Sequence, residues 1–292
     1  MKIGIAGTGR MGAAMALRLM SLGREVMVWN RTPAKTRPLA EAGAKVAPTA
    51  RELAENADIV LSIVTDAAAI ESAYRGEHGL LTGEVKGKLF VEMSTVRPQV
   101  QEGLARAVRA RGASLVDCPV GGSTGPARDG KLFGFIGGEA SDVSRARAVL
   151  DQLCRRVEHV GPVGGGARMK LTINLPLHVY WQALGEALYI SKSLGLDPAR
   201  VMDILADTSG GPNVLKTRGP ALAAALNGRD VSPVTFDVDS TRKDLRTMIE
   251  EAHALGAALP VSECALGCFD EAAQDGLGAR DVSALPARFV RK

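Results

Sequence analysis

Residues 1–12 read MKIGIAGTGRMG, and this stretch decides the fold of the first half of the chain. Its apolar start predicts a buried strand, three glycines follow as Gly7-x-Gly9-x-x-Gly12, and a helical pattern comes after them. A strand that ends in such a loop places backbone N–H groups and a helix N-terminus against a pyrophosphate. We interpret Gly7 as permitting the tight turn, Gly9 as letting the backbone approach the phosphates, and Gly12 as letting the helix pack closely. The stretch therefore predicts a dinucleotide site.

The end of the second predicted strand indicates which dinucleotide binds. This strand covers residues 25–29 and is followed by Asn30, Arg31 and Thr32, where dinucleotide sites contact the adenosine ribose. NAD sites usually carry a carboxylate here, which would repel a 2′-phosphate, whereas the Arg31 guanidinium can bind a phosphate bidentately. Thr32 adds a hydroxyl donor. We therefore expect NADP(H); the alternative is that Arg31 is a solvated surface residue.

Strand and helix patterns alternate as far as residue 160, which predicts a doubly wound α/β sheet. The near-continuous apolar run at residues 58–63 is typical of a parallel strand buried on both faces. Val64 and Thr65 follow it, at the carboxyl end of the sheet where ligands bind in such folds. Ser94 and Thr95 follow the next strand and are helix N-caps, cofactor contacts or both. Further strands are expected at 45–47, 88–93, 113–117, 132–138 and 156–160.

The bulk composition excludes several classes of protein. The 292 residues are 46% hydrophobic and 23% charged, which is typical of a globular chain long enough for two domains. The net charge of +4 is small and the basic residues are dispersed, so neither nucleic acid nor a membrane is an expected partner. A strand pattern from residue 2 leaves no room for a targeting peptide, and the scattered cysteines fit reduced thiols, so we expect a cytoplasmic protein without a bound metal.

A change in the sequence pattern near residue 161, from alternating strands and helices to helices alone, predicts the domain boundary. The segment GPVGGGARMK at residues 161–170 leads into a long helical pattern, and no strand pattern follows it. We therefore expect a dinucleotide-binding domain over residues 1–162 and a helical domain over residues 163–292. Pro176 predicts a local kink or a freed carbonyl near Thr172. The length of the central helix favours a homodimer or a higher homo-oligomer, in which another chain covers part of it.

Lys170 is the predicted catalytic residue. Hydride transfer between NADPH and a carbonyl needs a group that donates a proton to the oxygen, or accepts one in the reverse direction. A lysine in a dry cleft can act in this way, because burial lowers its pKa. Lys170 and Asn174 are four residues apart and share a helix face, which His178 extends. The alternative for Lys170 is a surface lysine at a helix start, which the preceding glycines disfavour.

Four motifs in order resemble those of the β-hydroxyacid dehydrogenases, the family that contains 3-hydroxyisobutyrate dehydrogenase and tartronate semialdehyde reductase. They are GTGRMG at 7–12, DCPVGGSTGPARDGKL at 117–132, GPVGGGARMKLTIN at 161–174 and TRKDL at 241–245. The resemblance covers essentially the whole chain. It implies an N-terminal Rossmann domain, a long linking helix and an all-helical C-terminal domain.

The resemblance also implies roles for individual residues. The family's catalytic lysine corresponds to Lys170 and its substrate-binding asparagine to Asn174, and the lysine of its KDL motif corresponds to Lys243, near cofactor and substrate. Gly122 and Ser123 lie in the segment that holds the substrate carboxylate in the family. The implied cofactor contacts are Gly7, Thr8, Gly9, Arg10, Met11, Gly12, Asn30, Arg31, Thr32, Val64, Thr65, Thr95 and Lys243.

One departure from the family pattern bears on the substrate. Where the family reads Val-Ser-Gly-Gly, this chain reads Val120-Gly121-Gly122-Ser123, so its serine comes two positions late. The substrate is therefore expected to be a small carbonyl compound or hydroxy acid, with a less polar aldehyde, ketone or imine left open. Related imine reductases usually lack the lysine, so Lys170 favours C=O chemistry. The alternatives are an imine reductase-like activity and a non-catalytic NADP(H)-responsive binding protein; a decarboxylating phosphogluconate-type reaction is disfavoured.

Overall fold

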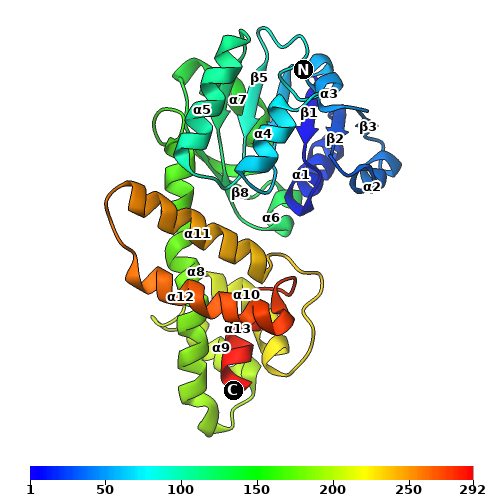
Figure 1. Ribbon diagram of the computed structural model, residues 1–292. Helices are drawn as coiled ribbons and strands as arrows, with labels where there is room; N and C mark the ends of the chain where they lie inside the picture. The colour runs from blue at the N-terminus through cyan, green and yellow to red at the C-terminus, as the bar shows by residue number, and fades with distance from the viewer. Residues whose placement is uncertain (292) are drawn as a thin grey trace. The chain divides into compact units, whose positions relative to one another are not determined.

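The computed structural model describes residues 1–291. Contacts divide the chain into two compact units, Met1–Leu171 and Thr172–Lys292, whose elements are labelled in Figure 1. The boundary between them falls inside helix α8 (Gly165–Ser191). The boundary expected from the sequence, between residues 162 and 163, comes just before this helix.

The first unit is built on a parallel sheet of six strands in the order β3-β2-β1-β4-β5-β6. In register, Ile5 lies between Val28 of β2 and Leu61 of β4. The order reverses direction at β1, which carries the glycine loop at its carboxyl end, so this is the doubly wound sheet expected from the sequence. The strands are β1 (Ile3–Ala6), β2 (Val26–Trp29), β3 (Lys45–Val46), β4 (Ile59–Ser62), β5 (Leu89–Glu92) and β6 (Ser114–Asp117).

Helices cover both faces of this sheet, because successive strand residues point to opposite sides. Along β4, Leu61 belongs to an apolar cluster with Met15 and Leu19 of α1, whereas Val60 belongs to a second cluster with Leu53 of α3. Figure 1 shows this layering. The helices of the unit are α1 (Arg10–Ser21), α2 (Arg37–Glu41), α3 (Ala50–Asn56), α4 (Ala67–Arg75), α5 (Pro98–Ala110), α6 (Thr124–Asp129) and α7 (Ala140–Leu153).

A second, three-stranded sheet was not anticipated from the sequence. Strands β8 (Leu132–Ile136) and β9 (Cys154–His159) were expected within the doubly wound sheet, but they pair in parallel with each other instead. The short β7 (Val120–Gly121) adds to β8 in the antiparallel direction. An isolated bridge between Asp117 and Gly137 connects the end of β6 to this second sheet.

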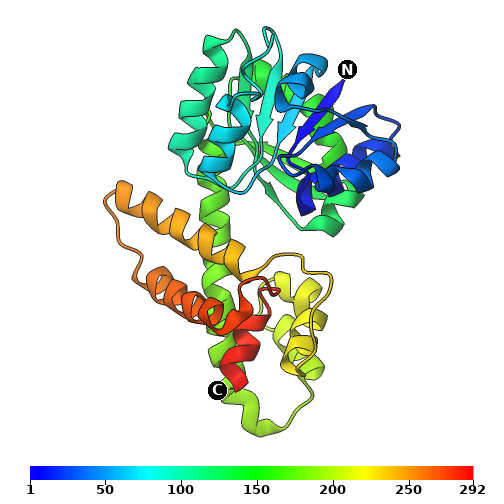
Figure 2. The ribbon, with the colours of Figure 1, turned by 45° about the vertical axis from the view of Figure 1, so that its right-hand side comes forward.

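The second unit is helical, as expected. Helix α8 continues through Pro176, and its last turn passes into a short 3₁₀ segment (Lys192–Leu194). Asp197 caps α9 (Pro198–Ala206) by accepting a hydrogen bond from Ala199 N, as its position before a proline predicts. Figure 2 shows these helices from a second side. The others are α10 (Val214–Leu226), α11 (Val238–Ala254), α12 (Pro260–Ala272) and α13 (Ala284–Arg291).

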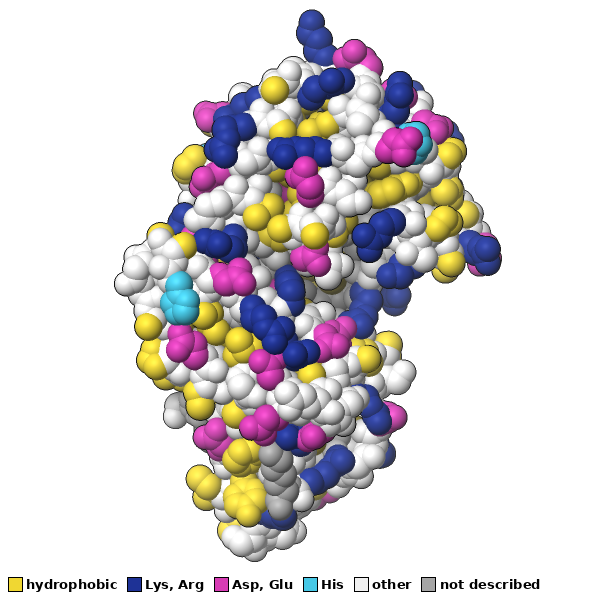
Figure 3. Space-filling model, in the orientation of Figure 1, with side chains coloured by type: hydrophobic (Ala, Val, Ile, Leu, Met, Phe, Trp, Pro, Cys, Tyr) yellow, Lys and Arg dark blue, Asp and Glu magenta, His cyan; other side chains and the backbone are white. Residues whose placement is uncertain are grey.

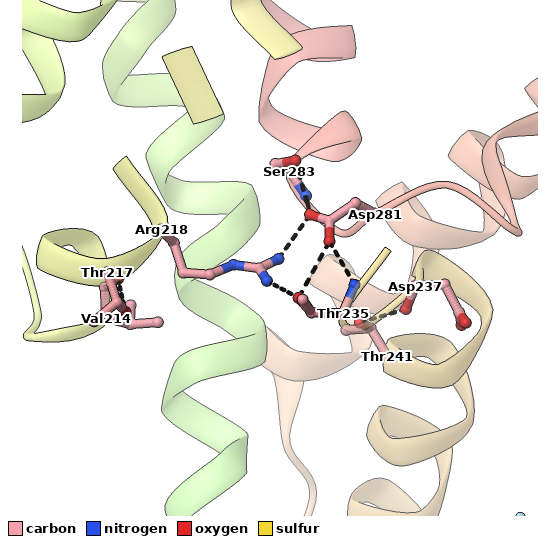
Figure 4. A network of polar contacts seen from close by, with 8 residues as sticks. All are labelled: Val214, Thr217, Arg218, Thr235, Asp237, Thr241, Asp281 and Ser283. Carbon is pink, nitrogen blue, oxygen red and sulfur yellow. Dashed lines mark hydrogen bonds and ion pairs between the residues drawn. The ribbon is translucent and has the colours of Figure 1, made fainter. Parts of the chain in front are cut away.

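A buried carboxylate ties three segments of the second unit together (Figure 4). Asp281 is 3% exposed and accepts hydrogen bonds from Arg218 of α10 at 2.6 Å and from the hydroxyl of Ser283 at 2.8 Å. The backbone N–H of Thr235 donates to its other oxygen at 3.3 Å, and Arg218 also donates to the Thr235 hydroxyl. The network fixes α10 against the segments that precede α11 and α13.

On one face of the molecule, charges of both signs are mixed. The face drawn in Figure 3 shows Lys and Arg side chains interspersed with Asp and Glu, in line with the small net charge of +4. Within residues 1–291, none of the helices is both long and apolar enough to span a membrane.

Candidate cofactor and catalytic site

The glycine loop has the geometry that its sequence predicts. Gly7 adopts φ +97°, and a Cβ there would lie 2.1 Å from the carbonyl oxygen of Ile63. A Cβ on Gly12 would lie 1.9 Å from the carbonyl oxygen of Gly7, so only glycine lets α1 start this close to the strand. At Gly9, by contrast, nothing lies within 4 Å of the Cβ position. Helix α1 begins beside this open space with no side-chain cap, so the loop fits a pyrophosphate.

At the end of β2, the side chain of Asn30 is used to shape the loop. Its oxygen accepts the N–H of Thr8 at 3.0 Å, and its amide donates to the carbonyl of Thr32 at 3.1 Å. The Thr8 hydroxyl donates to the carbonyl of Lys35 at 3.1 Å. Asn30 therefore holds the glycine loop against the segment that carries Arg31, whose side chain is exposed.

The loops after β4 and β5 are joined by a hydrogen bond rather than by helix capping. The Ser94 hydroxyl accepts from the N–H of Val64 at 2.9 Å. The next helix, α5, begins at Pro98 after Arg97, so the N-cap role considered for Ser94 and Thr95 is wrong for this helix. Proline at the first helical position fixes the start of α5 four residues beyond Ser94.

A buried acid, Glu92, lies beneath these two loops. Its carboxyl accepts from the Ser94 N–H at 2.7 Å and from the Ser62 hydroxyl at 2.5 Å, and the Tyr74 hydroxyl lies 2.5 Å from the same Ser62 oxygen. Glu92, Ser62 and Tyr74 are all fully buried. Burial raises the pKa of Glu92 to about 7, although the hydrogen bonds from Ser62 and Ser94 oppose the shift. The ends of β4 and β5 are thus held by a polar chain inside the apolar core.

Lys170 lies in the second turn of α8, and the start of that helix is held by Asp117. The Asp117 carboxylate, at the end of β6, accepts from the N–H of Gly164 at 2.8 Å and from the N–H of Ala167 at 2.7 Å. Asp117 is fully buried and Lys170 is 9% exposed. Burial raises the pKa of Asp117 to about 6 against the effect of the two N–H donors. Sequence analysis identified Lys170 but not its support.

The predicted substrate segment follows β7. Gly122 has φ +124°, and a Cβ there would lie 2.8 Å from a methyl carbon of Leu132, so this position requires glycine. Ser123 precedes α6 as its N-cap, but its side chain makes no capping hydrogen bond and is half-exposed. Its hydroxyl is therefore not committed to the helix.

In the second unit, the predicted residues Asn174 and Lys243 occur with a buried His–Asp pair. Lys243 Nζ lies 2.5 Å from Asp244 Oδ1, and His178 Nε2 lies 3.5 Å from Asp244 Oδ2. The His178 ring stacks on Phe236 with its centroid 5.6 Å away. Burial alone would raise the pKa of Asp244, but the contacts with His178 and Lys243 outweigh it and lower the pKa. Asn174 lies one turn after Lys170 on α8 and is 9% exposed.

The predicted residues thus fall into two groups. The glycine loop, residues 30–32, Val64, Thr65, Thr95, residues 122–123 and Lys170 belong to the first unit; Asn174 and Lys243 belong to the second. Sequence reasoning missed Glu92, Asp117 and Asp244. For Glu92 and Asp117, the available signal was an acidic residue at the end of an otherwise apolar strand, in KLFVEM and in SLVD.

Comparison with known proteins agrees with this geometry. A model described as the NAD binding domain of 6-phosphogluconate dehydrogenase matches residues 2–161. A second, described as the NAD-binding domain of NADP-dependent 3-hydroxyisobutyrate dehydrogenase, matches residues 164–288. The first match ends at residue 161 and the second begins at residue 164.

Individual relatives span nearly the whole chain. It is 34% identical to 3-hydroxyisobutyrate dehydrogenase of Pseudomonas aeruginosa, over 93% of this chain and 92% of that protein. It is 30% identical to glyoxylate/succinic semialdehyde reductase 1 of Arabidopsis thaliana, over 98% and 97%. The solved structure of Psf3 in complex with NADP+ and 2-OPP superposes with a TM-score of 0.86 at 27% identity, covering 99% of each chain. The chain therefore belongs to the β-hydroxyacid dehydrogenase family of NAD(P)-dependent oxidoreductases.

Proposed function

We propose that this protein transfers a hydride between NADP(H) and a small carbonyl compound or hydroxy acid, with Lys170 as the general acid or base. The observation that carries the proposal is the open cradle beside Gly9, where nothing lies within 4 Å of the Cβ position at the uncapped start of α1. In a member of an oxidoreductase family, such a cradle suits a dinucleotide.

The choice of NADP(H) rests on the end of β2. Asn30 carries no charge, and its amide group is already engaged by Thr8 and Thr32. No carboxylate therefore stands at this position to bind a ribose 2′-hydroxyl or to repel a 2′-phosphate. The exposed Arg31 guanidinium and the Thr32 hydroxyl are the groups that would bind such a phosphate.

When bound, the cofactor supplies the hydride, so a side chain of the protein must donate or accept the proton. In the reductive direction, the Lys170 ammonium donates a proton to the substrate oxygen as negative charge develops on it. In the oxidative direction, the neutral amine accepts the hydroxyl proton. Asn174, one turn along the same helix, would orient the substrate oxygen by hydrogen bonding.

Substrate recognition is assigned to Gly122, Ser123 and Lys243. The uncommitted Ser123 hydroxyl and the Gly122 backbone N–H suit a carboxylate, and Lys243 adds a positive charge that Asp244 partly balances. Named relatives act on 3-hydroxyisobutyrate and on glyoxylate or succinic semialdehyde, so these small acids are the first candidates. The position of Ser123, two residues later than the usual serine, favours an altered preference among them.

A substrate panel tests the proposal. Purified protein is assayed at the NADPH absorbance band with glyoxylate, succinic semialdehyde, less polar aldehydes and ketones, and pre-formed imines, and in reverse with 3-hydroxyisobutyrate and NADP+. We expect turnover of at least one carbonyl compound, and a loss of several orders of magnitude in Lys170→Ala with NADPH binding retained. Turnover confined to imines would favour an imine reductase, and no turnover with tight NADPH binding would favour a cofactor-responsive binding protein. Near-normal turnover in Lys170→Ala would overturn the role of the lysine.

We also propose that the chain forms a homodimer through the end of α8 and the 3₁₀ segment that follows it. Tyr189, Ile190 and Leu194 are 48%, 81% and 65% exposed, which is unusual for large apolar side chains so close together. Light scattering of the wild type and of Ile190→Glu tests this: a dimer that dissociates in the variant is expected, and a monomeric wild type would contradict it.

A further inference from the structure

The start of α8 is fixed by two hydrogen bonds to one buried side chain. Asp117 Oδ1 accepts the N–H of Gly164 at 2.8 Å, and Asp117 Oδ2 accepts the N–H of Ala167 at 2.7 Å. Both donors belong to the first turn or the residue before it, where backbone N–H groups have no partner within the helix. A bidentate carboxylate satisfies two of them at once, and its charge is favourable at a helix N-terminus.

The surrounding backbone packs tightly against this helix start. A Cβ on Gly166 would lie 2.2 Å from the carbonyl oxygen of Phe135, and a Cβ on Gly137 would lie 2.5 Å from Asp117 Oδ1. The backbones of α8, β8 and β6 are thus in direct contact around the carboxylate. Asp117 also exchanges backbone hydrogen bonds with Gly137 at 3.1 and 2.8 Å, which fixes its own position.

Lys170 follows Ala167 by three residues, which is less than one turn of the helix. Any rotation or shift of the first turn therefore moves the lysine directly. We propose that Asp117 is a positioning residue for Lys170. Its two carboxylate oxygens hold the N–H groups of Gly164 and Ala167, and these contacts determine the position of the Lys170 amine during hydride transfer. This inference rests on the proposed function of Lys170.

The two hydrogen bonds need the ionised carboxylate of Asp117. Protonation places an O–H donor on one of the two oxygens, where it faces a backbone N–H group instead of accepting from it. Three acids interact with Asp117: Glu102 of α5, whose charge raises the pKa of Asp117, Glu92 of β5 and the neighbouring Cys118. These groups are acids, so none of them stabilises the charge. With the pKa of Asp117 raised to about 6, we expect the rate of hydride transfer to fall as the pH drops through that region.

The test compares two amide substitutions at helix starts. Asp117→Asn keeps the size of the side chain but leaves only one oxygen to accept, and we expect the single-turnover rate of NADPH oxidation, with the substrate found in the panel, to fall by about tenfold to hundredfold. The Kd for NADPH should change by less than about threefold, because the glycine loop is not touched. Asp197→Asn is the matched control, because Asp197 caps α9, a helix that carries no site residue. The single-turnover rate of this variant should equal that of the wild type.

A double-mutant cycle separates positioning from general destabilisation. If Asp117 acts through Lys170, Asp117→Asn should lower the residual rate of Lys170→Ala by less than about twofold, because no lysine remains to be misplaced. An equal effect in both backgrounds would overturn the inference. A wild-type rate in Asp117→Asn, together with loss of turnover in Lys170→Ala, would also overturn the inference. If Lys170→Ala is itself active, the proposed function of Lys170 is wrong instead. Should Asp117→Asn not fold, a wild-type rate that is flat between pH 5 and 7.5 overturns the inference instead.

Discussion

Ser62 and Glu92 lie directly opposite each other on the parallel strands β4 and β5, and the serine hydroxyl donates to the carboxyl at 2.5 Å. Neither side chain reaches solvent. The pair stands at the carboxyl end of the sheet, directly beneath Val64 and Ser94, in loops where the cofactor is expected. A titratable group there couples the stability of the cofactor domain to pH.

The first prediction concerns this coupling. The pKa of Glu92 is about 7 in the folded chain against an ordinary 4.5, so the folded state holds a proton that the unfolded state releases between these values. The stabilising contribution is therefore complete below pH 4.5 and is lost as the pH rises to 7 and beyond, by about 3 kcal/mol in the free energy of unfolding. Urea unfolding at pH 5, 6, 7 and 8 measures it.

Glu92→Gln isolates the effect of this residue. Glutamine keeps an oxygen for the Ser94 N–H but does not titrate, so the free energy of unfolding of the variant should fall less steeply with pH than that of the wild type. Asp117 also has a raised pKa and remains in both proteins, so the difference reports the titration of Glu92 together with its electrostatic effect on Asp117. Parallel pH curves for the two proteins would show that Glu92 does not titrate in this range.

The Tyr74 hydroxyl gives a second prediction. It lies 2.5 Å from Ser62 Oγ, and at pH 8, where Glu92 is ionised, Ser62 donates its own proton to the carboxylate, so the tyrosine is the donor to the serine. Tyr74→Phe should lower the free energy of unfolding by about 1–2 kcal/mol, because it leaves a buried acceptor unsatisfied. Tyr180→Phe is the control: its hydroxyl donates to Gly210 at 3.2 Å near the surface, and the loss there should be smaller. Equal losses in thermal or urea unfolding would contradict the buried relay.

A third prediction compares two ion pairs of the second unit. Asp281 is buried and accepts from Arg218, Thr235 and Ser283, so Asp281→Ala should cost about 3 kcal/mol of unfolding free energy by leaving the arginine unpaired. The Arg280–Asp230 pair has side chains 49% and 74% exposed, and Asp230→Ala should cost less than about 1 kcal/mol. Urea unfolding of both variants checks the ranking, and a similar cost for the two would show that the network of Figure 4 does not stabilise the unit.

Local patterns in the sequence were enough for the main architecture. The glycine loop, the apolar run at 58–63 and the alternation of strands and helices predict the doubly wound sheet, because each depends on neighbours within one βα unit. The second sheet escaped prediction because the pattern of β8 shows that it is a strand but not which strand it joins. Its partner β7 is only two residues long and lies in a glycine-rich segment with no periodicity.

The candidate site divides in the same way. Lys170 and Arg31 stand out because their positions are set by nearby motifs. Glu92 meets Ser62 across 30 residues, and Asp117 meets Gly164 across 47, so these contacts exist only once the sheet has formed. Ser94 is an instructive failure: its place between a strand and a helix suggests a cap, but Pro98 fixes the helix start further on and frees the hydroxyl for Val64.

The last prediction concerns the choice between the two nicotinamide cofactors. Arg31 follows β2 at the edge of the glycine loop, and Asn30 beside it offers no carboxylate. Arg31→Asp removes the proposed phosphate ligand and adds a charge that repels a 2′-phosphate, so the Kd for NADPH should rise by about tenfold to hundredfold. The Kd for NADH should stay level or improve, because the new carboxylate can accept from the ribose 2′-hydroxyl.

Arg24→Asp provides the matched control, because it makes the same change in charge at the opposite end of the same strand. Arg24 is exposed and donates to Gln152, away from the glycine loop. Fluorescence titrations of both cofactors against both variants separate a local contact from the general attraction of a positive protein, which falls with added salt. If the two substitutions weaken NADPH binding equally, Arg31 has no specific phosphate contact. If NADH and NADPH already bind the wild type equally well, the end of β2 does not select the cofactor at all.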